Sequence, residues 1–204
     1  MSLPIFQQLY DNLYEVPEIK GLNAVIQDGD KVLELGSGLG IITALAARKA
    51  GSGRVVSYEA NPGMIADTRA FLAANNVTSV DLRPGVLVPE DVAPGATRMF
   101  YLHASFAESS LKYTAGKGVE VPATSLPQVM AEFRPDVLLC DIEGAEAELL
   151  AGIDASHLRA AVIEFHPAVL NRAEVASIYD AFAKHRLYPA IELSSGTVVV
   201  FTKA

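Results

Sequence analysis

The sequence predicts an α/β domain built on a mostly parallel β-sheet with helices on both faces. Two observations predict it. Short apolar runs, typical of strands buried on both faces, alternate along the chain with segments of helical pattern. A turn with three glycines at residues 36–40 joins the first such run to a helical segment, and sheets of this class bind ligands at such turns. The length of 204 residues fits a single domain over residues 1–204.

The first part of the chain begins with a predicted N-terminal helical cap, residues 1–24. Residues 4–14 of this cap carry a helical stripe of apolar side chains, which Pro17 and Gly21 are expected to interrupt. Beyond the cap, the predicted strands are 31–35, 54–58 and 80–83, separated by helices at 41–50 and 61–75. Asn61 is expected to cap the second of these helices, with Pro62 in its first turn.

The second part starts with the least regular segment, residues 84–117. Within it, the stretch RMFYLHASFAESSLKY is compatible with a strand pair or with an active-site loop. After it, the predicted order is a short strand, a helix from about Leu126, a strand at 137–141, a short helix at 145–151, a strand at 160–165 and an amphipathic helix at 173–185. Residues 190–193 and 197–202 are expected to form a hairpin that adds an antiparallel edge to the sheet.

The charge balance argues against a nucleic-acid partner. Acidic residues outnumber lysine and arginine by 24 to 16, the net charge is −8, and the basic residues are scattered. No apolar run reaches the roughly 18–20 residues that span a bilayer, and the first residues lack the pattern of a secretory signal. The single cysteine, Cys140, cannot form an internal disulfide. We therefore expect a cytoplasmic protein with neither a membrane nor a nucleic-acid partner.

The glycine turn, GSGLG at residues 36–40, differs from the fingerprint of dinucleotide-binding sites. Ile41 stands where the dinucleotide fingerprint GxGxxG needs its third glycine. With Glu34 two residues before it, the turn resembles motif I of the Rossmann-like S-adenosylmethionine-dependent methyltransferases. The resemblance implies that Gly36 and Gly38 pack against this cofactor and that Glu34 lies near its amino-acid end. The full set of cofactor-binding candidates is Glu34, Gly36, Ser37, Gly38, Gly40, Glu59, Ala60 and Asp141.

Glu59 follows the second predicted strand, at the edge of the sheet where the glycine turn lies. A carboxylate at this point can accept hydrogen bonds from both ribose hydroxyls of a nucleoside, a chemistry shared by NAD and S-adenosylmethionine sites. The alternatives are that Glu59 caps the next helix or is simply solvated. Because it follows this glycine turn, the ribose interaction is favoured.

A second segment, "CDIEGAEAELL", resembles the KIDVEGAE segment of the FkbM family of methyltransferases. The matching residues are Asp141, Glu143, Gly144, Ala145 and Glu146, and "ASFAESSLKY" before them and "AVIEFHPAV" after them follow the order of that family. The chain departs from the family at Cys140, where lysine is usual, and in its glycine turn, which is often GAxxG in the family. The resemblance covers roughly residues 25–170. It implies a Rossmann-like class I methyltransferase fold with a seven-stranded sheet, S-adenosylmethionine as the cofactor and S-adenosylhomocysteine as the product.

The candidate catalytic residues are Asp141, Glu143 and His166, which lie at the ends of two neighbouring predicted strands. Methyl transfer is an in-line displacement, so the enzyme must mainly align its two substrates and, for a hydroxyl acceptor, remove a proton. The alternatives without a catalytic role are that the carboxylates complement the positive end of the next helix and that His166 is an ordinary loop residue. With Glu164, the same side chains could also bind a divalent metal, but nothing in the sequence fixes their geometry, and no metal is favoured.

These observations together predict a methyltransferase that methylates an oxygen of a small-molecule, sugar or natural-product acceptor. Residues 84–117, with His103 as a weaker candidate, and the N-terminal helix are expected to line the acceptor side. Two alternatives stay open: a nicotinamide-dependent oxidoreductase, against which Ile41 counts, and a cofactor-binding protein without turnover. The acid motif is not the Asp/Asn-Pro-Pro-Tyr/Phe run common in amino methyltransferases, which lowers the odds of amine methylation.

Overall fold

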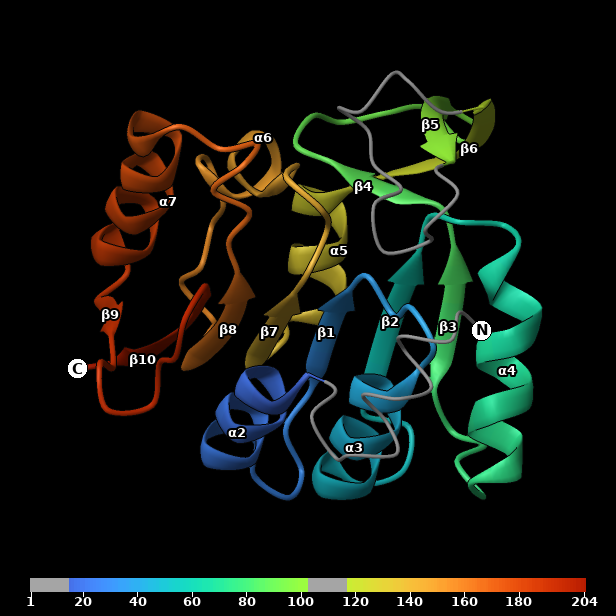
Figure 1. Cartoon of the computed structure of the whole chain (residues 1–204), viewed down its shortest axis with the longest axis horizontal. Coiled ribbons are helices and arrows are strands. Elements are labelled where there is room, and N and C mark those ends of the chain that lie inside the picture. Colours follow the sequence, from blue (N-terminus) through green and yellow to red (C-terminus); the bar gives the residue numbers. More distant parts are fainter. Residues whose placement is uncertain (1–14, 103–116) are drawn as a thin grey trace.

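The computed structural model describes residues 15–102 and 117–204 and contains a seven-stranded β-sheet. The strand order is β3-β2-β1-β7-β8-β10-β9, seen from right to left in Figure 1. The strands are β1 (Val32–Leu35), β2 (Val55–Glu59), β3 (Asp81–Pro84), β7 (Val137–Cys140), β8 (Ala160–Glu164), β9 (Leu187–Pro189) and β10 (Val198–Lys203). Strand β10 is antiparallel to both of its neighbours, and the other pairings are parallel. The prediction of a mostly parallel sheet with antiparallel pairing at its C-terminal edge is confirmed.

Strand β1 lies inside the sheet, between β2 and β7. Leu35 pairs with Tyr58 of β2 on one side and with Cys140 of β7 on the other. Every residue of β1 is buried, as are those of β2 and β7, so these strands lack the polar alternation of a sheet with one wet face. Because β1, β2, β7 and β8 pair in parallel, their carboxyl ends meet at one edge of the sheet, which is the upper edge in Figure 1.

Within residues 15–102 and 117–204, six helices cover the two faces of the sheet. They are α2 (Val16–Val25), α3 (Ile41–Ala50), α4 (Met64–Ala74), α5 (Leu126–Phe133), α6 (Glu146–Leu150) and α7 (Arg172–Lys184). The side chains of α2, α3 and α4 share one hydrophobic cluster with the sheet, and those of α5, α6 and α7 share another on the opposite face. Local capping fixes two helix starts: Ser125 Oγ accepts from the Gln128 amide at α5, and Asn171 and Glu174 form a capping box at α7.

Residues 84–117 are more regular, in the part that the structure describes, than the sequence suggested. Strands β4 (Val86–Val88), β5 (Thr97–Leu102) and β6 (Lys117–Ser125) form a separate sheet in the order β4-β6-β5, placed above the carboxyl edge of the large sheet (Figure 1). Five buried side chains give this sheet its own small core: Val86, Val88, Phe100, Val121 and Ala123. Of the stretch RMFYLHASFAESSLKY, residues 98–102 belong to β5, and residues 103–113 lie outside the described residues.

One of the two predicted breaks in the N-terminal cap, at Gly21, is wrong. Pro17 lies in the first turn of α2, where its missing N–H costs nothing, and the stripe that it was expected to interrupt is not among the described residues. Gly21 continues the same helix because its face packs closely on the sheet: a Cβ there would lie 3.0 Å from Val162 and 3.1 Å from Val200. The helical stripe at residues 4–14 lies outside the described residues.

Two further boundaries differ from the prediction. Asn61 does not cap α4: its side chain accepts a hydrogen bond from the Gly63 amide, and the helix begins at Met64 instead of at residue 61. The predicted strand at 190–193 is a turn, and the edge strand is β9, whose Pro189 pairs with Phe201. Proline is tolerated in this strand because it lies at the edge of the sheet.

None of the helices within residues 15–102 and 117–204 has both the length and the hydrophobicity that crossing a membrane requires.

Candidate functional site

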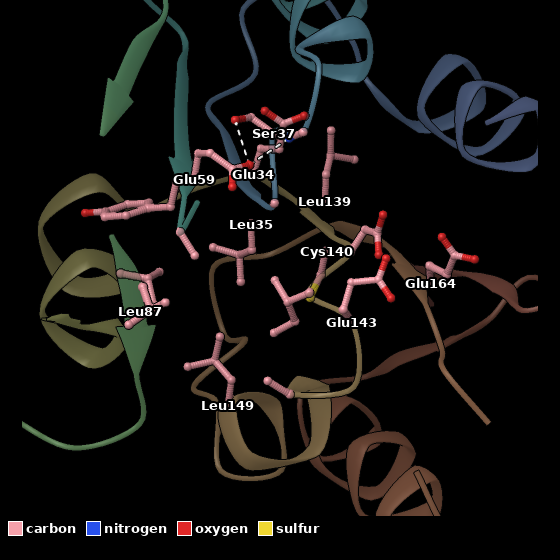
Figure 2. Close-up of a pocket in the computed structure, with 18 of the residues that line it drawn as sticks. Glu34, Leu35, Ser37, Glu59, Leu87, Leu139, Cys140, Glu143, Leu149 and Glu164 are labelled. Carbon is pink, nitrogen blue, oxygen red and sulfur yellow. Dashed lines mark hydrogen bonds between the residues drawn. The ribbon is translucent and has the colours of Figure 1, made fainter. Parts of the chain in front are cut away.

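A pocket opens at the carboxyl edge of the large sheet, between the glycine turn and the ends of β7 and β8. Figure 2 shows Ser37 and Glu59 at one end and Glu143 and Glu164 toward the other, with Leu35 between them. Strand β4 and helix α6 contribute Leu87 and Leu149 to its apolar wall. The pocket thus lies where a parallel α/β sheet binds its ligands.

The three glycines of the turn have positive φ angles but different surroundings. A Cβ on Gly36 would lie 1.8 Å from the carbonyl oxygen of Asp141, and one on Gly40 would lie 2.9 Å from Thr68 of α4. These two glycines therefore allow the turn to contact its neighbours in the fold. A Cβ on Gly38, in contrast, would meet no protein atom within 4 Å, and Gly38 lines the pocket. Of the three, Gly38 is the one whose bare backbone faces space that a ligand can occupy.

Glu59 ends β2 with its carboxylate tied to the glycine turn. Oε2 accepts a hydrogen bond from the Gly38 amide at 2.8 Å and a longer one from Ser37 Oγ at 3.4 Å, while Oε1 accepts from the Asn61 amide at 2.7 Å. Burial raises the pKa of Glu59, and these hydrogen bonds oppose the rise. The carboxylate is thereby fixed in position, and its remaining acceptor capacity is available at the pocket.

Glu34 is almost fully buried in β1 and also lines the pocket. Its Oε2 accepts hydrogen bonds from Thr43 Oγ1 at 2.7 Å and from Ser57 Oγ at 2.5 Å. Its Oε1 is buried and has no hydrogen-bond partner among the described residues. Burial raises the pKa of Glu34 to about 7, despite the two hydroxyl donors.

At the other end, one histidine lies among three carboxylates. His166 Nε2 is 3.2 Å from Glu143 Oε2 and 3.5 Å from Asp141 Oδ1, and its Nδ1 is 2.8 Å from Glu146 Oε1. Glu146 is fully buried and also accepts from the Gly144 amide at 3.0 Å. The carboxylate of Glu146 therefore orients the imidazole and directs its other nitrogen at Asp141 and Glu143.

The pKa values of Asp141 and His166 are both raised in this cluster. Burial raises the pKa of Asp141 well above its usual value, and the nearby Glu164 and Glu143 charges add to the rise. Burial lowers the pKa of His166, but the hydrogen bond and charge of Glu146, with the charges of Asp141 and Glu143, outweigh it and raise that pKa to about 9. The acids around His166 therefore stabilise positive charge at this position.

The described lining of the pocket contains eight carboxylate side chains and neither lysine nor arginine. The carboxylates are Glu15, Glu18, Glu34, Glu59, Asp141, Glu143, Glu148 and Glu164. Glu18, on α2, has its pKa raised to about 7 by burial and by the neighbouring Glu164. Opposite these acids lie apolar side chains, among them Leu87, Phe100 and Leu149. A lining of this kind favours ligands that combine an apolar or aromatic part with positive charge.

Most residues predicted from the sequence lie together in this site. Those on the pocket lining are Glu34, Gly36, Ser37, Gly38, Glu59, Ala60, Asp141 and Glu143. Gly40 lies behind the turn against α4, and His166 contacts the cluster without being part of the lining. His103 lies outside the described residues. Sequence reasoning missed the orienting role of Glu146, although the family resemblance included this residue, and it gave no signal for Glu18.

Comparisons with solved structures agree on the fold. An O-methyltransferase from Bacillus cereus, solved in complex with S-adenosylhomocysteine, is 15% identical and superposes with a TM-score of 0.55 over 98% of this chain and 89% of that one. A TehB-like S-adenosylmethionine-dependent methyltransferase from Corynebacterium glutamicum is also 15% identical, with a TM-score of 0.51 over 98% and 96% of the chains. The ribosomal protein L11 methylase of Lactobacillus delbrueckii is 14% identical, with a TM-score of 0.52 over 92% and 78%.

Sequence comparison identifies the family. No curated protein sequence matches the chain significantly. The model of the methyltransferase FkbM domain matches residues 36–188, which include the glycine turn, Glu59 and the cluster around His166. The match covers well over half of the chain and confirms the fold, the family and the S-adenosylmethionine cofactor that the sequence predicts. The chain with this glycine turn and this acidic cluster belongs to the FkbM family of methyltransferases.

Proposed function

We propose that this protein transfers the methyl group of S-adenosylmethionine to a hydroxyl oxygen of a small-molecule acceptor. The observation that carries the proposal is that one pocket joins the glycine turn and Glu59 to the strand ends that hold Asp141 and Glu143. A donor on the turn and an acceptor beside the acids would share this space. Alignment of two bound substrates is the main requirement of a displacement reaction.

The cofactor end supports a nucleoside with a cationic amino-acid tail. The open space over Gly38 can receive the cofactor against bare main chain, and the fixed carboxylate of Glu59 can accept hydrogen bonds from ribose hydroxyls. The buried Oε1 of Glu34, which lacks a hydrogen-bond donor among the described residues, can accept one from the ammonium group. The acidic lining also favours the positive sulfonium.

The other end supports a hydroxyl acceptor, because a hydroxyl must lose its proton as it is methylated. A lone pair of the acceptor oxygen attacks the methyl carbon, the carbon–sulfur bond breaks with its electrons moving to sulfur, and the hydroxyl proton passes to a carboxylate of the cluster. Asp141 is suited to receive it because it lies on the pocket lining, directly after the end of β7. His166, which follows β8, lies beside this carboxylate and that of Glu143.

The size and polarity of the surroundings support a small acceptor with an apolar portion. Leu87 and Phe100 of the small sheet and Leu149 of α6 face the acids across the pocket. The part of α2 that carries Glu15 and Glu18 borders the same side. Residues 84–117 and the N-terminal helix are therefore the segments that we expect to select the acceptor.

The proposal is tested first by binding and then by transfer. S-adenosylmethionine and S-adenosylhomocysteine should raise the melting temperature, and NAD, the ligand of the oxidoreductase alternative, should not. Methyl transfer from labelled cofactor is then measured over fractionated small metabolites. Asp141→Asn should retain cofactor affinity while the transfer rate falls by about 100-fold or more, the usual contribution of a general base.

The matched control is Glu148→Gln, which changes another carboxylate of the same lining and should leave transfer close to that of the unmodified protein. Stabilisation by NAD alone would refute the cofactor assignment. Equal transfer rates for Asp141→Asn and Glu148→Gln would remove Asp141 from the mechanism.

A further inference from the structure

We propose that Asp141, Glu143 and His166 bind a divalent cation, with Mn²⁺ as a suitable ion. One ligand atom from each of the three residues lies within 4.8 Å of the other two. His166 Nε2 is 3.2 Å from Glu143 Oε2 and 3.5 Å from Asp141 Oδ1. Ligand atoms about 2.0–2.2 Å from a common ion are roughly 3 to 3.5 Å apart when they occupy adjacent positions, so these separations fit a shared ion.

The same cluster contains a buried carboxylate oxygen that lacks a hydrogen-bond donor in the part of the chain that the structure describes. Asp141 Oδ1 is buried, faces His166 Nε2 and accepts no hydrogen bond from any described residue. A buried carboxylate oxygen without a donor is costly, and a bound cation would supply the missing interaction. This buried oxygen distinguishes the cluster from a group of exposed surface acids, whose oxygens are hydrogen-bonded to water.

The histidine is held in the way that metal-ligating histidines are held. Its Nδ1 is bonded to the fully buried Glu146, which is fixed in turn by the Gly144 amide, so that Nε2 is directed at the two acids. A carboxylate behind a ligating imidazole sets its orientation and increases its basicity. Glu146 would thus act as a positioning residue that does not touch the ion.

The donor set indicates the class of ion. Two carboxylates suit Mg²⁺ and Mn²⁺, and an imidazole suits first-row transition metals, so Mn²⁺ accommodates all three ligands. Three protein ligands leave coordination positions open for water or for an acceptor oxygen. The sequence alone does not favour a metal because spacing does not fix how these side chains meet; the structure supplies that geometry.

The site lies on the acceptor side of the pocket, since Asp141 and Glu143 are part of the lining (Figure 2 labels Glu143). A cation there could hold the acceptor oxygen and favour its deprotonated form. This role in catalysis rests on the proposed function, whereas binding of the ion does not. The two claims can therefore fail separately.

The experiment measures Mn²⁺ binding to the full chain without cofactor, from the loss of the free-ion signal in electron paramagnetic resonance. We expect one Mn²⁺ per chain, displaced by Zn²⁺ or Mg²⁺. Glu143→Gln should weaken binding at least tenfold, and Glu148→Gln, in the same acidic lining, should leave it unchanged. Circular dichroism and melting temperature verify that both variants are folded, and Asp141→Asn is a second ligand variant should Glu143→Gln unfold.

Absence of a bound Mn²⁺, or equal weakening in Glu143→Gln and Glu148→Gln, would overturn the site. Stoichiometric binding that depends on Glu143 but without methyl transfer to any acceptor would support the site and contradict the proposed function. Transfer that continues at full rate after removal of metal with EDTA would overturn the role of the ion in holding the acceptor.

Discussion

Replacing Gly38 by alanine tests whether the cofactor lies on the glycine turn. Gly38 has a φ of +49°, and the new Cβ would meet no protein atom within 4 Å. The substitution therefore adds only the strain of the left-handed backbone, about 1–2 kcal/mol, to the folded protein without ligand. In the complex, the Cβ would enter the space of the cofactor, and overpacking of this kind costs about 1–3 kcal/mol. Since 1.4 kcal/mol is a factor of ten, we expect roughly 5- to 150-fold weaker binding.

Gly53→Ala provides the control for backbone strain. Gly53 has a φ of +69°, has no neighbouring atom within 4 Å of the Cβ position, and is not on the described pocket lining. Both variants should lose similar unfolding free energy in urea titrations, but only Gly38→Ala should lose affinity for S-adenosylhomocysteine in isothermal titration calorimetry. If the two variants bind the ligand within twofold of each other, the cofactor does not lie against Gly38, and the assignment of the turn is wrong.

Three other substitutions test the fold around the site. In urea unfolding, Gly36→Ala should cost more than about 3 kcal/mol of unfolding free energy, because its Cβ would lie 1.8 Å from the Asp141 carbonyl oxygen. Gly29→Ala is the control: Gly29 has the same φ of +87° with open surroundings, so the substitution should cost only about 1–2 kcal/mol. Glu34, with a pKa of about 7, keeps its proton to higher pH when folded than when unfolded, so its contribution to stability should fall by up to about 3 kcal/mol as the pH rises from 4.5 through 7. The difference between the unmodified protein and Glu34→Gln, measured by urea unfolding at pH 5 and pH 8, should show this loss, and a pH-independent difference would contradict it. Asn171→Ala removes the side-chain cap of α7 and should lower the unfolding free energy by about 1 kcal/mol; no change in the urea midpoint would mean that the capping box contributes nothing.

The central strands and helices could be predicted because their signals are local. The first helix after the turn was expected at residues 41–50 and is α3, Ile41–Ala50. Strand β7 was expected at residues 137–141 and ends one residue earlier, at Cys140. Continuous apolar runs, a glycine turn and helix-forming residues act over a few positions, so the sequence contains the information directly.

The errors arose where a distant contact decides the structure. Gly21 looks like a helix break, but it lies inside α2 because the helix packs against Val162 and Val200, far along the chain. Residues 190–193 are as strand-like as β9 in composition, and it is the pairing of Pro189 with Phe201 that selects β9 as the edge. Long-range packing and strand register cannot be inferred from local pattern.

The candidate site was predictable in its position and less so in its connections. Acids at the ends of apolar strands predicted the location of Glu59 and Asp141, since the carboxyl ends of parallel strands meet at one edge. The contact between Glu146 and His166 joins residues twenty positions apart and depends on how α6 follows β7, which the sequence does not reveal. The expectations of a cytoplasmic location and of no nucleic-acid partner stay predictions.

The close approach of Gly36 to Asp141 has a consequence for how such an enzyme can diversify. The Asp141 amide also donates to the Leu35 carbonyl oxygen at 2.9 Å, so the turn and the end of β7 are joined through main-chain atoms. The separation between a donor on the turn and a reactive group beside Asp141 is then a property of the backbone, largely independent of rotamers or of any closing movement. Substitutions in the small sheet of β4, β5 and β6 could accumulate and alter which molecules enter while the reaction distance stays constant.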